Sequence, residues 1–165
     1  EHGLGTMTYG SLAGGILTGA MRTVPKLDIG DTRRSFYKVY QEPEFSQVMK
    51  VLAVLDKIAE AHNNAPLAQV VINWQSQKEY VSTCICGVRN PKEALENCSG
   101  MDWSLSDEEM AMIDNALETY LNDEFMAQAD IHAREAIWDD YEKEHGEPHP
   151  WKVEMMKHLA EQEKK

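Results

Sequence analysis

The sequence has few cysteines, no long apolar run and fewer basic than acidic residues. Its 165 residues include three cysteines, Cys84, Cys86 and Cys98, and no run approaches the ~20 apolar residues of a membrane-spanning helix. An odd cysteine count without the spacing of a disulfide framework predicts a reducing compartment, so we expect the cytoplasm. The net charge of −12 disfavours nucleic acid and anionic membrane surfaces as partners.

The start of the chain also lacks two features. It opens with Glu1-His2-Gly3, without a signal peptide and without an initiator methionine. We therefore expect that upstream residues have been removed or left out. The length and composition, with 42% hydrophobic and 27% charged residues, are typical of one soluble domain.

Alternating strands and helices are predicted in the larger, N-terminal part of the chain. Strands are expected at residues 6–9 and 80–86, and a long loop at residues 20–43. The expected helices begin at or just after Pro43, Pro66, Asn90 and Ser106. Strands that alternate with helices predict parallel βα units. Because two strands cannot form a stable doubly covered sheet, we expect them to pair with a missing upstream part or with another chain.

The helix limits follow from apolar spacing and capping residues. The first helix buries one stripe at positions i, i+3, i+4 and i+7 and ends at Asn63-Asn64. That stripe consists of Val48, Val51, Leu52, Leu55, Ile58, Ala59 and His62. The second helix is expected to start at Pro66 and to bury Leu67, Val70, Val71 and Trp74. Capping boxes are expected at Asn90 with Glu93 and at Ser106 with Glu109.

The segment from Asn122 to Lys165 carries 12 acidic and six basic residues. It is predicted to be a solvated, acidic helical extension, with one helix from about 122 to 145 and another from Trp151. Three of its histidines, His132, His145 and His149, do not have the spacing of a zinc motif, so no metal site is expected.

Several sulfur-containing side chains have a structural interpretation. Cys84 and Cys86 alternate onto one face of the second strand and are expected to be buried thiols. The methionines expected to serve packing are Met110, Met112, Met155 and Met156.

A glycine-rich segment, Tyr9 to Gly19, follows the first strand. Glycines at this place let backbone N–H groups approach an anionic ligand and adopt positive φ. Tyr9 could present a flat face to an aromatic ring. A flexible turn with a core tyrosine would give the same pattern, and no Gly-Lys-Ser/Thr of a Walker P-loop follows.

The second candidate segment, Gly87 to Glu93, joins the second strand to a helix N-terminus. Free N–H donors and a partial positive charge attract phosphate to such a terminus, and Arg89 and Lys92 add full charges. A capped helix with solvated basic residues is the alternative. Because ligands bind at the carboxyl ends of parallel strands, where both segments lie, each segment strengthens the interpretation of the other.

These segments, in order and spacing, resemble aldo-keto reductases over roughly residues 4 to 120. The similarity lies in Tyr9–Gly19, Asp31-Thr32-Arg33, Gln69 to Trp74, and Ile85–Pro91 followed by Glu96-Asn97. The resemblance implies a C-terminal part of a TIM (β/α)8 barrel, strands seven and eight with their helices. Residues 1–121 would then form a partial cofactor-binding barrel, and residues 122–165 an acidic helical extension dispensable for cofactor binding.

The resemblance also implies reversible hydride transfer between NADPH and an aldehyde or ketone substrate. Tyr9 would stack on the nicotinamide, the turn would hold the pyrophosphate, and the second segment would surround the 2′-phosphate and the adenine. The residues so implied are Tyr9, Gly10, Ser11, Leu12, Gly14, Gly15, Leu17, Gly87, Val88, Arg89, Asn90, Lys92, Glu96 and Asn97.

Two departures from the family pattern affect function. Glu93 stands where the family often has Arg or Gln, and a carboxylate there does not favour a phosphate, which leaves NAD as a possible cofactor. The family's catalytic Asp, Tyr, Lys and His lie on the first four strands, which this chain lacks, so no residue here is assigned as catalytic. The resemblance therefore implies a part of an oxidoreductase that is inactive alone. The alternative is a non-catalytic nucleotide-binding or regulatory module on the same scaffold.

Overall fold

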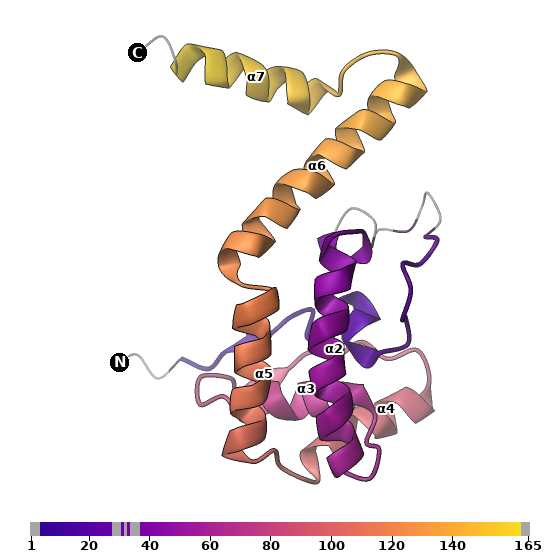
Figure 1. The fold of residues 1–165 in the computed structure, drawn as a ribbon, viewed down its shortest axis with the longest axis vertical. Helices are drawn as coiled ribbons and strands as arrows, with labels where there is room; N and C mark the ends of the chain where they lie inside the picture. Colours follow the sequence, from indigo (N-terminus) through magenta and orange to yellow (C-terminus); the bar gives the residue numbers. More distant parts are fainter. Residues whose placement is uncertain (1–3, 28–30, 32, 34–36, 163–165) are drawn as a thin grey trace.

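The computed structural model describes residues 4–27, 31, 33 and 37–162, which form a helical body with a small parallel sheet at one edge. Figure 1 shows α2 and α5 side by side in the body, α6 rising away from it, and α7 crossing at the far end. In chain order the elements are β1 Met7–Thr8, the 3-10 helix η1 Ala13–Thr18, the 3-10 helix η2 Lys38–Tyr40, α2 Glu44–Ala61, α3 Leu67–Ser76, β2 Thr83–Cys84, α4 Pro91–Cys98, the 3-10 helix η3 Ser99–Met101, α5 Asp107–Tyr120, α6 Asp123–His145 and α7 Pro150–Gln162.

The sheet has the expected parallel direction but shorter strands than expected. Met7 lies opposite Thr83 and Thr8 opposite Cys84. Both strands are only two residues long, so the expected limits of 6–9 and 80–86 are wrong. Within the described residues each strand has a partner on one edge only, and a two-stranded ladder is marginal on its own.

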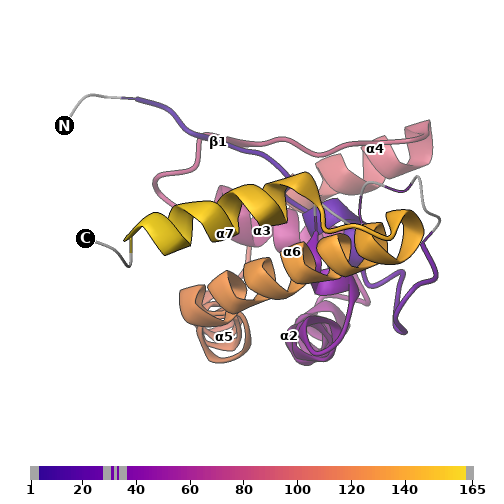
Figure 2. The ribbon, with the colours of Figure 1, turned by 90° about the horizontal axis from the view of Figure 1, so that it is seen from above.

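The sheet lies at one edge of the body, with α2, α3 and α5 all on one side of it (Figure 2). On strand β1 the side chain of Met7 is exposed, as is that of Tyr9 just after the strand. Residues two apart on a strand point to the same face, so one face of the sheet has no cover from the described helices. This half-covered sheet is that of a partial barrel.

The core forms where α2, α3 and α5 pack together. The predicted apolar stripe of α2 is buried, except that His62 is half-buried and terminates the helix. Asn63 and Asn64 follow with φ of 57° and 56°, which ends the helix where the sequence predicted. Ile113 and Ala116 bring the inner face of α5 into the same core.

Helix α3 differs in two details from the prediction. It begins at Leu67, with Pro66 as its N-cap, and Leu67, Val70 and Val71 are buried as expected. Trp74 is only half-buried, because its indole Nε1 donates to the Asp114 carboxylate at 2.8 Å near the surface. A tryptophan commonly keeps its N–H at a polar partner in this way.

The capping residues are confirmed, with one difference. Ser106 and Glu109 form the complete capping box that opens α5. Asn90 caps α4 by accepting from the Glu93 N–H at 3.0 Å. The expected return bond is wrong, because the Glu93 carboxylate accepts from the Arg89 N–H, one residue earlier.

The expected burial of sulfur-containing residues holds only in part. Met110 packs against the core, but Met112 and Met156 are exposed. Met112 precedes the buried Ile113 and therefore lies on the outer side of α5. Cys84 and Cys86 are half-buried rather than buried.

The C-terminal helices occur where the sequence predicted them, but α6 is not simply solvated. Ala129 has no exposed surface and Trp138 is buried. Helix α6 packs against η2, within the segment expected to be a structureless loop, of which residues 28–30, 32 and 34–36 lie outside the described residues. The acidic composition of the segment did not reveal the contact between α6 and η2, because this contact involves only one narrow stripe of α6.

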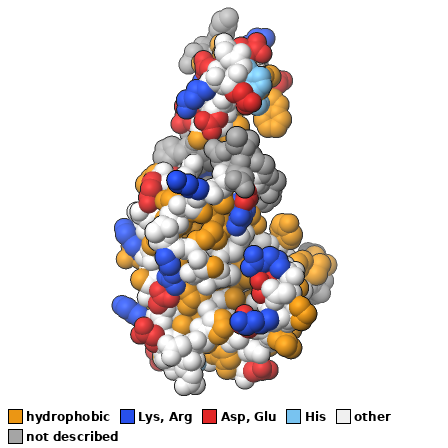
Figure 3. All heavy atoms as spheres, turned by 90° about the vertical axis from the view of Figure 1, so that its right-hand side faces the viewer, with side chains coloured by type: hydrophobic (Ala, Val, Ile, Leu, Met, Phe, Trp, Pro, Cys, Tyr) orange, Lys and Arg blue, Asp and Glu red, His pale blue; other side chains and the backbone are white. Residues whose placement is uncertain are grey.

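The surface of the α6–α7 end mixes charged and apolar side chains, with Trp151 and Met156 exposed. Figure 3 shows acidic, basic and apolar side chains and a histidine at this narrow end, and basic side chains interspersed with acidic ones over the body. The Tyr141 ring stacks on that of His145, with ring centroids 4.1 Å apart, and lies edge-on to that of His149. The side chain of His132 lies outside the described residues. Among the described helices, none combines the length and the apolar character needed to cross a membrane.

Candidate cofactor site

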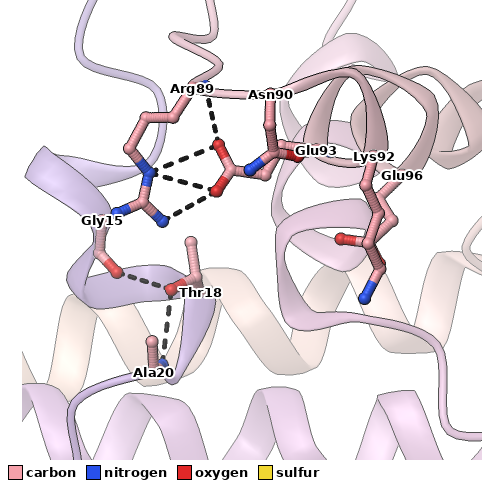
Figure 4. Close-up of polar contacts among 8 residues, drawn as sticks. All are labelled: Gly15, Thr18, Ala20, Arg89, Asn90, Lys92, Glu93 and Glu96. Atoms are coloured by element: carbon pink, nitrogen blue, oxygen red, sulfur yellow. Dashed lines mark hydrogen bonds and ion pairs between the residues drawn. The ribbon is translucent and has the colours of Figure 1, made fainter.

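Parallel pairing brings the two candidate segments together at the carboxyl end of the sheet. The Ile85 N–H donates to the Thr8 carbonyl at 2.9 Å, just before each segment begins. Figure 4 shows Gly15 and Thr18 of the glycine-rich turn beside the Arg89 side chain. The expectation that the two segments share one edge is therefore confirmed.

The glycine-rich turn has a backbone that requires glycine at particular positions. Gly10, Gly14 and Gly15 have φ of 71°, 66° and 100°, and Ala13 has φ of 47°. A Cβ atom on Gly14 would lie 2.7 Å from Cε2 of Tyr37, whereas one on Gly15 would meet nothing within 4 Å. The turn is thus packed on one side and open on the other, which fits the close approach of an anionic ligand.

Residues far along the chain hold this turn in place. The Gln75 amide Nε2 donates to the Ser11 carbonyl at 2.7 Å. The Tyr40 hydroxyl donates to the Gly14 carbonyl at 2.9 Å, and the Tyr40 ring is buried. Burial raises the pKa of Tyr40, which keeps the hydroxyl protonated and able to donate.

An ion pair supports Tyr40 from the same segment. The Arg33 guanidinium lies 5.9 Å from the centre of the Tyr40 ring. Arg33 also donates to both carboxylate oxygens of Asp31, at 2.9 and 3.1 Å from Nε, and these bonds lower the pKa of Asp31 to about 2. Of the motif Asp31-Thr32-Arg33, the middle residue lies outside the described residues.

Sequence reasoning missed the roles of Tyr37 and Tyr40. Both lie in the segment interpreted as a long loop, because weak periodicity and several turn formers concealed the 3-10 turn at residues 38–40. The two tyrosines three residues apart were the available signal, since large aromatic side chains in a loop usually pack against something.

The Arg89 segment is exposed and is held by local contacts. The Arg89 side chain is 88% exposed, and its guanidinium lies against the Glu93 carboxylate, with Nη2–Oε1 at 2.7 Å and Nε–Oε1 at 3.1 Å. This pairing raises the pKa of Arg89 and lowers that of Glu93. The positive charge at the start of α4 is therefore already matched by a carboxylate (Figure 4).

A second ion pair between residues four apart lies three residues further along the chain. Lys92 Nζ lies 3.5 Å from Glu96 Oε1, four residues later. Both basic residues predicted to contact a phosphate, Arg89 and Lys92, thus have a carboxylate partner on α4.

The remaining residues predicted to bind the cofactor differ in their exposure to solvent. Tyr9, Gly87, Val88 and Asn90 are exposed, and Glu96 and Asn97 are half-buried on α4. Ser11 is buried, while Leu12 and Leu17 pack against the core, so these three can offer a ligand mainly their backbone. No group of three or more metal-ligating side chains occurs among the described residues.

Comparison with known proteins identifies the family. The two parallel strands, with the candidate segments at their carboxyl ends and helices after them, are those of an α/β protein. The sequence model of the Aldo/keto reductase family matches residues 1–118. The chain therefore belongs to the aldo/keto reductase family.

Individual relatives agree with this assignment. The chain is 29% identical over 133 residues to Aldo-keto reductase YhdN of Bacillus subtilis, covering 77% of this chain and 39% of that protein. It is 29% identical over 120 residues to a "Putative voltage-gated potassium channel subunit beta" of Schizosaccharomyces pombe, covering 70% and 35%. The structure of the glycerol dehydrogenase AKR11B4 from Gluconobacter oxydans matches with a TM-score of 0.64 and 26% identity, over 73% of this chain and 36% of that one.

These shares define the extent of the match. The chain spans a little over a third of the length of each of these relatives. The described fold is accordingly the C-terminal part of a TIM (β/α)8 barrel, followed by additional helices.

Proposed function

We propose that this chain forms the cofactor-binding part of an NADP-dependent aldo-keto reductase, which transfers hydride between NADPH and an aldehyde or ketone. One observation carries the proposal: a turn with glycines at positive φ lies beside a helix N-terminus that bears Arg89. Such a pair of segments suits a ligand with two separated phosphate groups. The names of the relatives support an oxidoreductase.

The residues present fit this cofactor. When bound, its nicotinamide ring would supply or accept the hydride. The open space beside Gly15 leaves room for the pyrophosphate, and the exposed ring of Tyr9 is available for stacking. The α4 N-terminus with Arg89, Asn90 and Lys92 would surround the 2′-phosphate, and Glu96 and Asn97 the adenine.

The Arg89–Glu93 pair favours NAD as a second candidate cofactor. A 2′-phosphate must displace the Glu93 carboxylate from the guanidinium or bind beside it, and like charges repel at this distance. NAD lacks this phosphate and would leave the ion pair intact.

The catalytic acid would come from strands outside this chain. Because one face of the sheet is uncovered and both outer edges lack partners within the described residues, the remaining barrel strands would pack here, and self-association is the alternative. The chain alone would then bind cofactor without turnover. The three cysteines are free thiols, which is compatible with the cytoplasm.

A non-catalytic regulatory module is the competing function. The relative described as a potassium channel subunit beta favours it, because that name describes a subunit rather than an enzyme. Carbonyl reduction by the whole protein would distinguish the two functions, since cofactor binding alone is compatible with both.

The test combines binding and turnover. Calorimetric titration of the 165-residue chain with NADPH is expected to show one site. NADPH oxidation with aldehydes and 1,2-dicarbonyls is expected to be absent, since general acid–base catalysis contributes about 10²–10⁴-fold to such reactions. No binding of either NADPH or NADH would contradict the cofactor site. Turnover that survives repurification and that a substitution in this chain abolishes would contradict the assignment of the acid to other strands.

A further inference from the structure

The conformation of the glycine-rich turn depends on residues 37–40, which include the short 3-10 turn η2. In the described part of residues 20–43, the helical residues are Arg33 and the three-residue 3-10 turn η2. Nevertheless Val39 and Tyr40 are buried, and Tyr40 donates to the Gly14 carbonyl. Ordering such a segment is entropically unfavourable, so other elements must pack against it.

Two helices pack against η2. One is α2, which follows it directly in the chain, and the other is α6, which comes from the C-terminal extension. Ala129 of α6 has no exposed surface, and Met126, three residues earlier and on the same side of the helix, packs against the main core. Seen from above, α6 passes over this end of the body (Figure 2). The family match ends at residue 118, before α6 begins.

We propose that α6 positions the glycine-rich turn for its ligand by holding η2 in place, with Tyr40 as the residue that connects η2 to the turn. The inference rests on the proposed function, in which the turn holds the cofactor pyrophosphate. It reverses the expectation that residues beyond 121 are dispensable for cofactor binding. Tyr40 is a positioning residue, because it bonds to the turn backbone on the side packed against the protein.

Two substitutions disrupt this connection at different points. Tyr40→Phe removes the hydroxyl that donates to Gly14 and keeps the buried ring. Ala129→Glu places a carboxylate at a fully buried position of α6, the helix that packs against η2. Ala136→Glu is the matched control, because it is the same change on an exposed position of the same helix.

The ligands separate positioning of the turn from general loss of structure. ADP-ribose contains the pyrophosphate, whereas adenosine 2′-phosphate lacks it and uses only the Arg89 segment. We expect Tyr40→Phe to weaken NADPH and ADP-ribose about three- to tenfold, the value of one neutral hydrogen bond. Ala129→Glu is expected to weaken them at least as much, Ala136→Glu to leave them unchanged, and adenosine 2′-phosphate to bind equally well to all variants. Equal effects of the two alanine substitutions, or a parallel loss of adenosine 2′-phosphate, would overturn the proposal.

Hydrogen exchange separates failure of this inference from failure of the proposed function. If the unmodified protein binds none of these ligands, the proposed function fails, but the turn can still be examined directly. Amides of residues 10–19 are expected to exchange faster in Tyr40→Phe and Ala129→Glu than in Ala136→Glu. Unchanged exchange in the first two variants would refute the positioning role.

Discussion

The glycine-rich turn and the Arg89 segment face the same proposed ligand but are stabilised differently. Contacts from residues distant in sequence, Tyr37, Tyr40 and Gln75, fix the backbone of the turn. The Arg89 segment is held by Asn90 and Glu93, at most four residues away, and its guanidinium is exposed. The turn therefore contributes shape, which depends on the fold, and the Arg89 segment contributes charge, which depends on its immediate neighbours.

This difference predicts that the largest loss of binding comes from a change in the shape of the turn. Gly14→Ala introduces a side chain at φ of 66° and places its Cβ 2.7 Å from Cε2 of Tyr37. A left-handed non-glycine residue costs about 1–2 kcal/mol and overpacking about 1–3 kcal/mol. We expect NADPH and NADH to weaken together by about 30-fold or more, measured by fluorescence titration.

Gly87→Ala is the control for this prediction. Gly87 belongs to the Arg89 segment, and a Cβ there would meet nothing within 4 Å. Its substitution is expected to change the affinity for either cofactor by no more than about twofold. If Gly87→Ala weakens binding as much as Gly14→Ala, the Arg89 segment also acts through its shape, and the contrast between the two segments is wrong.

The second prediction concerns Arg89, whose charge should affect one cofactor only. The 2′-phosphate is the group by which NADPH differs from NADH, so a charge directed at it changes one affinity and not the other. Arg89→Ala is expected to weaken NADPH about tenfold and to leave NADH unchanged. This loss of affinity is at the low end of the range for a hydrogen bond to a charged group, because the Arg89 side chain is exposed and already paired with Glu93.

Dissociation constants of both cofactors for the Arg89→Ala variant provide the measurement. Equal weakening of NADPH and NADH binding would mean that Arg89 stabilises the conformation of its segment rather than binding the 2′-phosphate. If neither changes, the 2′-phosphate does not bind here, and NAD becomes the better assignment.

The same contrast explains which parts of the molecule could be predicted from sequence. Local patterns were sufficient for the Ser106–Glu109 capping box, the Asn90 cap and the buried stripe of α2, because the interacting residues lie within a few positions of one another. The parallel direction of the strands was also predictable from their alternation with helices. Strand length was not, because it depends on how many neighbouring strands are present.

Besides strand length, the sequence did not reveal contacts between segments that are distant in the chain. The elements η2 and α6 lie far apart in the chain, and neither carries a local signal for their packing against each other. The return bond of Glu93 was assigned to the wrong donor for a related reason. Carboxylates of this kind can accept from two adjacent N–H groups, and the preceding guanidinium of Arg89 determined which one.

The smallest expected effect comes from removing the negative charge beside Arg89. Glu93→Gln keeps the size of the side chain but abolishes the ion pair, which frees the guanidinium for a phosphate and removes a repulsive charge. Because both groups are exposed and screened by salt, we expect NADPH affinity to rise only about two- to threefold, with no change for NADH. The gain should shrink as ionic strength increases from about 0.05 to 0.5 M, since the Debye length falls over this range. Glu108→Gln, the same change at an exposed position of α5, is the control for a general effect of net charge. Equal gains in both variants would mean that the overall charge of the chain, rather than the carboxylate next to Arg89, limits NADPH binding. A loss of NADPH affinity in Glu93→Gln alone would show that Glu93 orients Arg89 for the phosphate instead of competing with it.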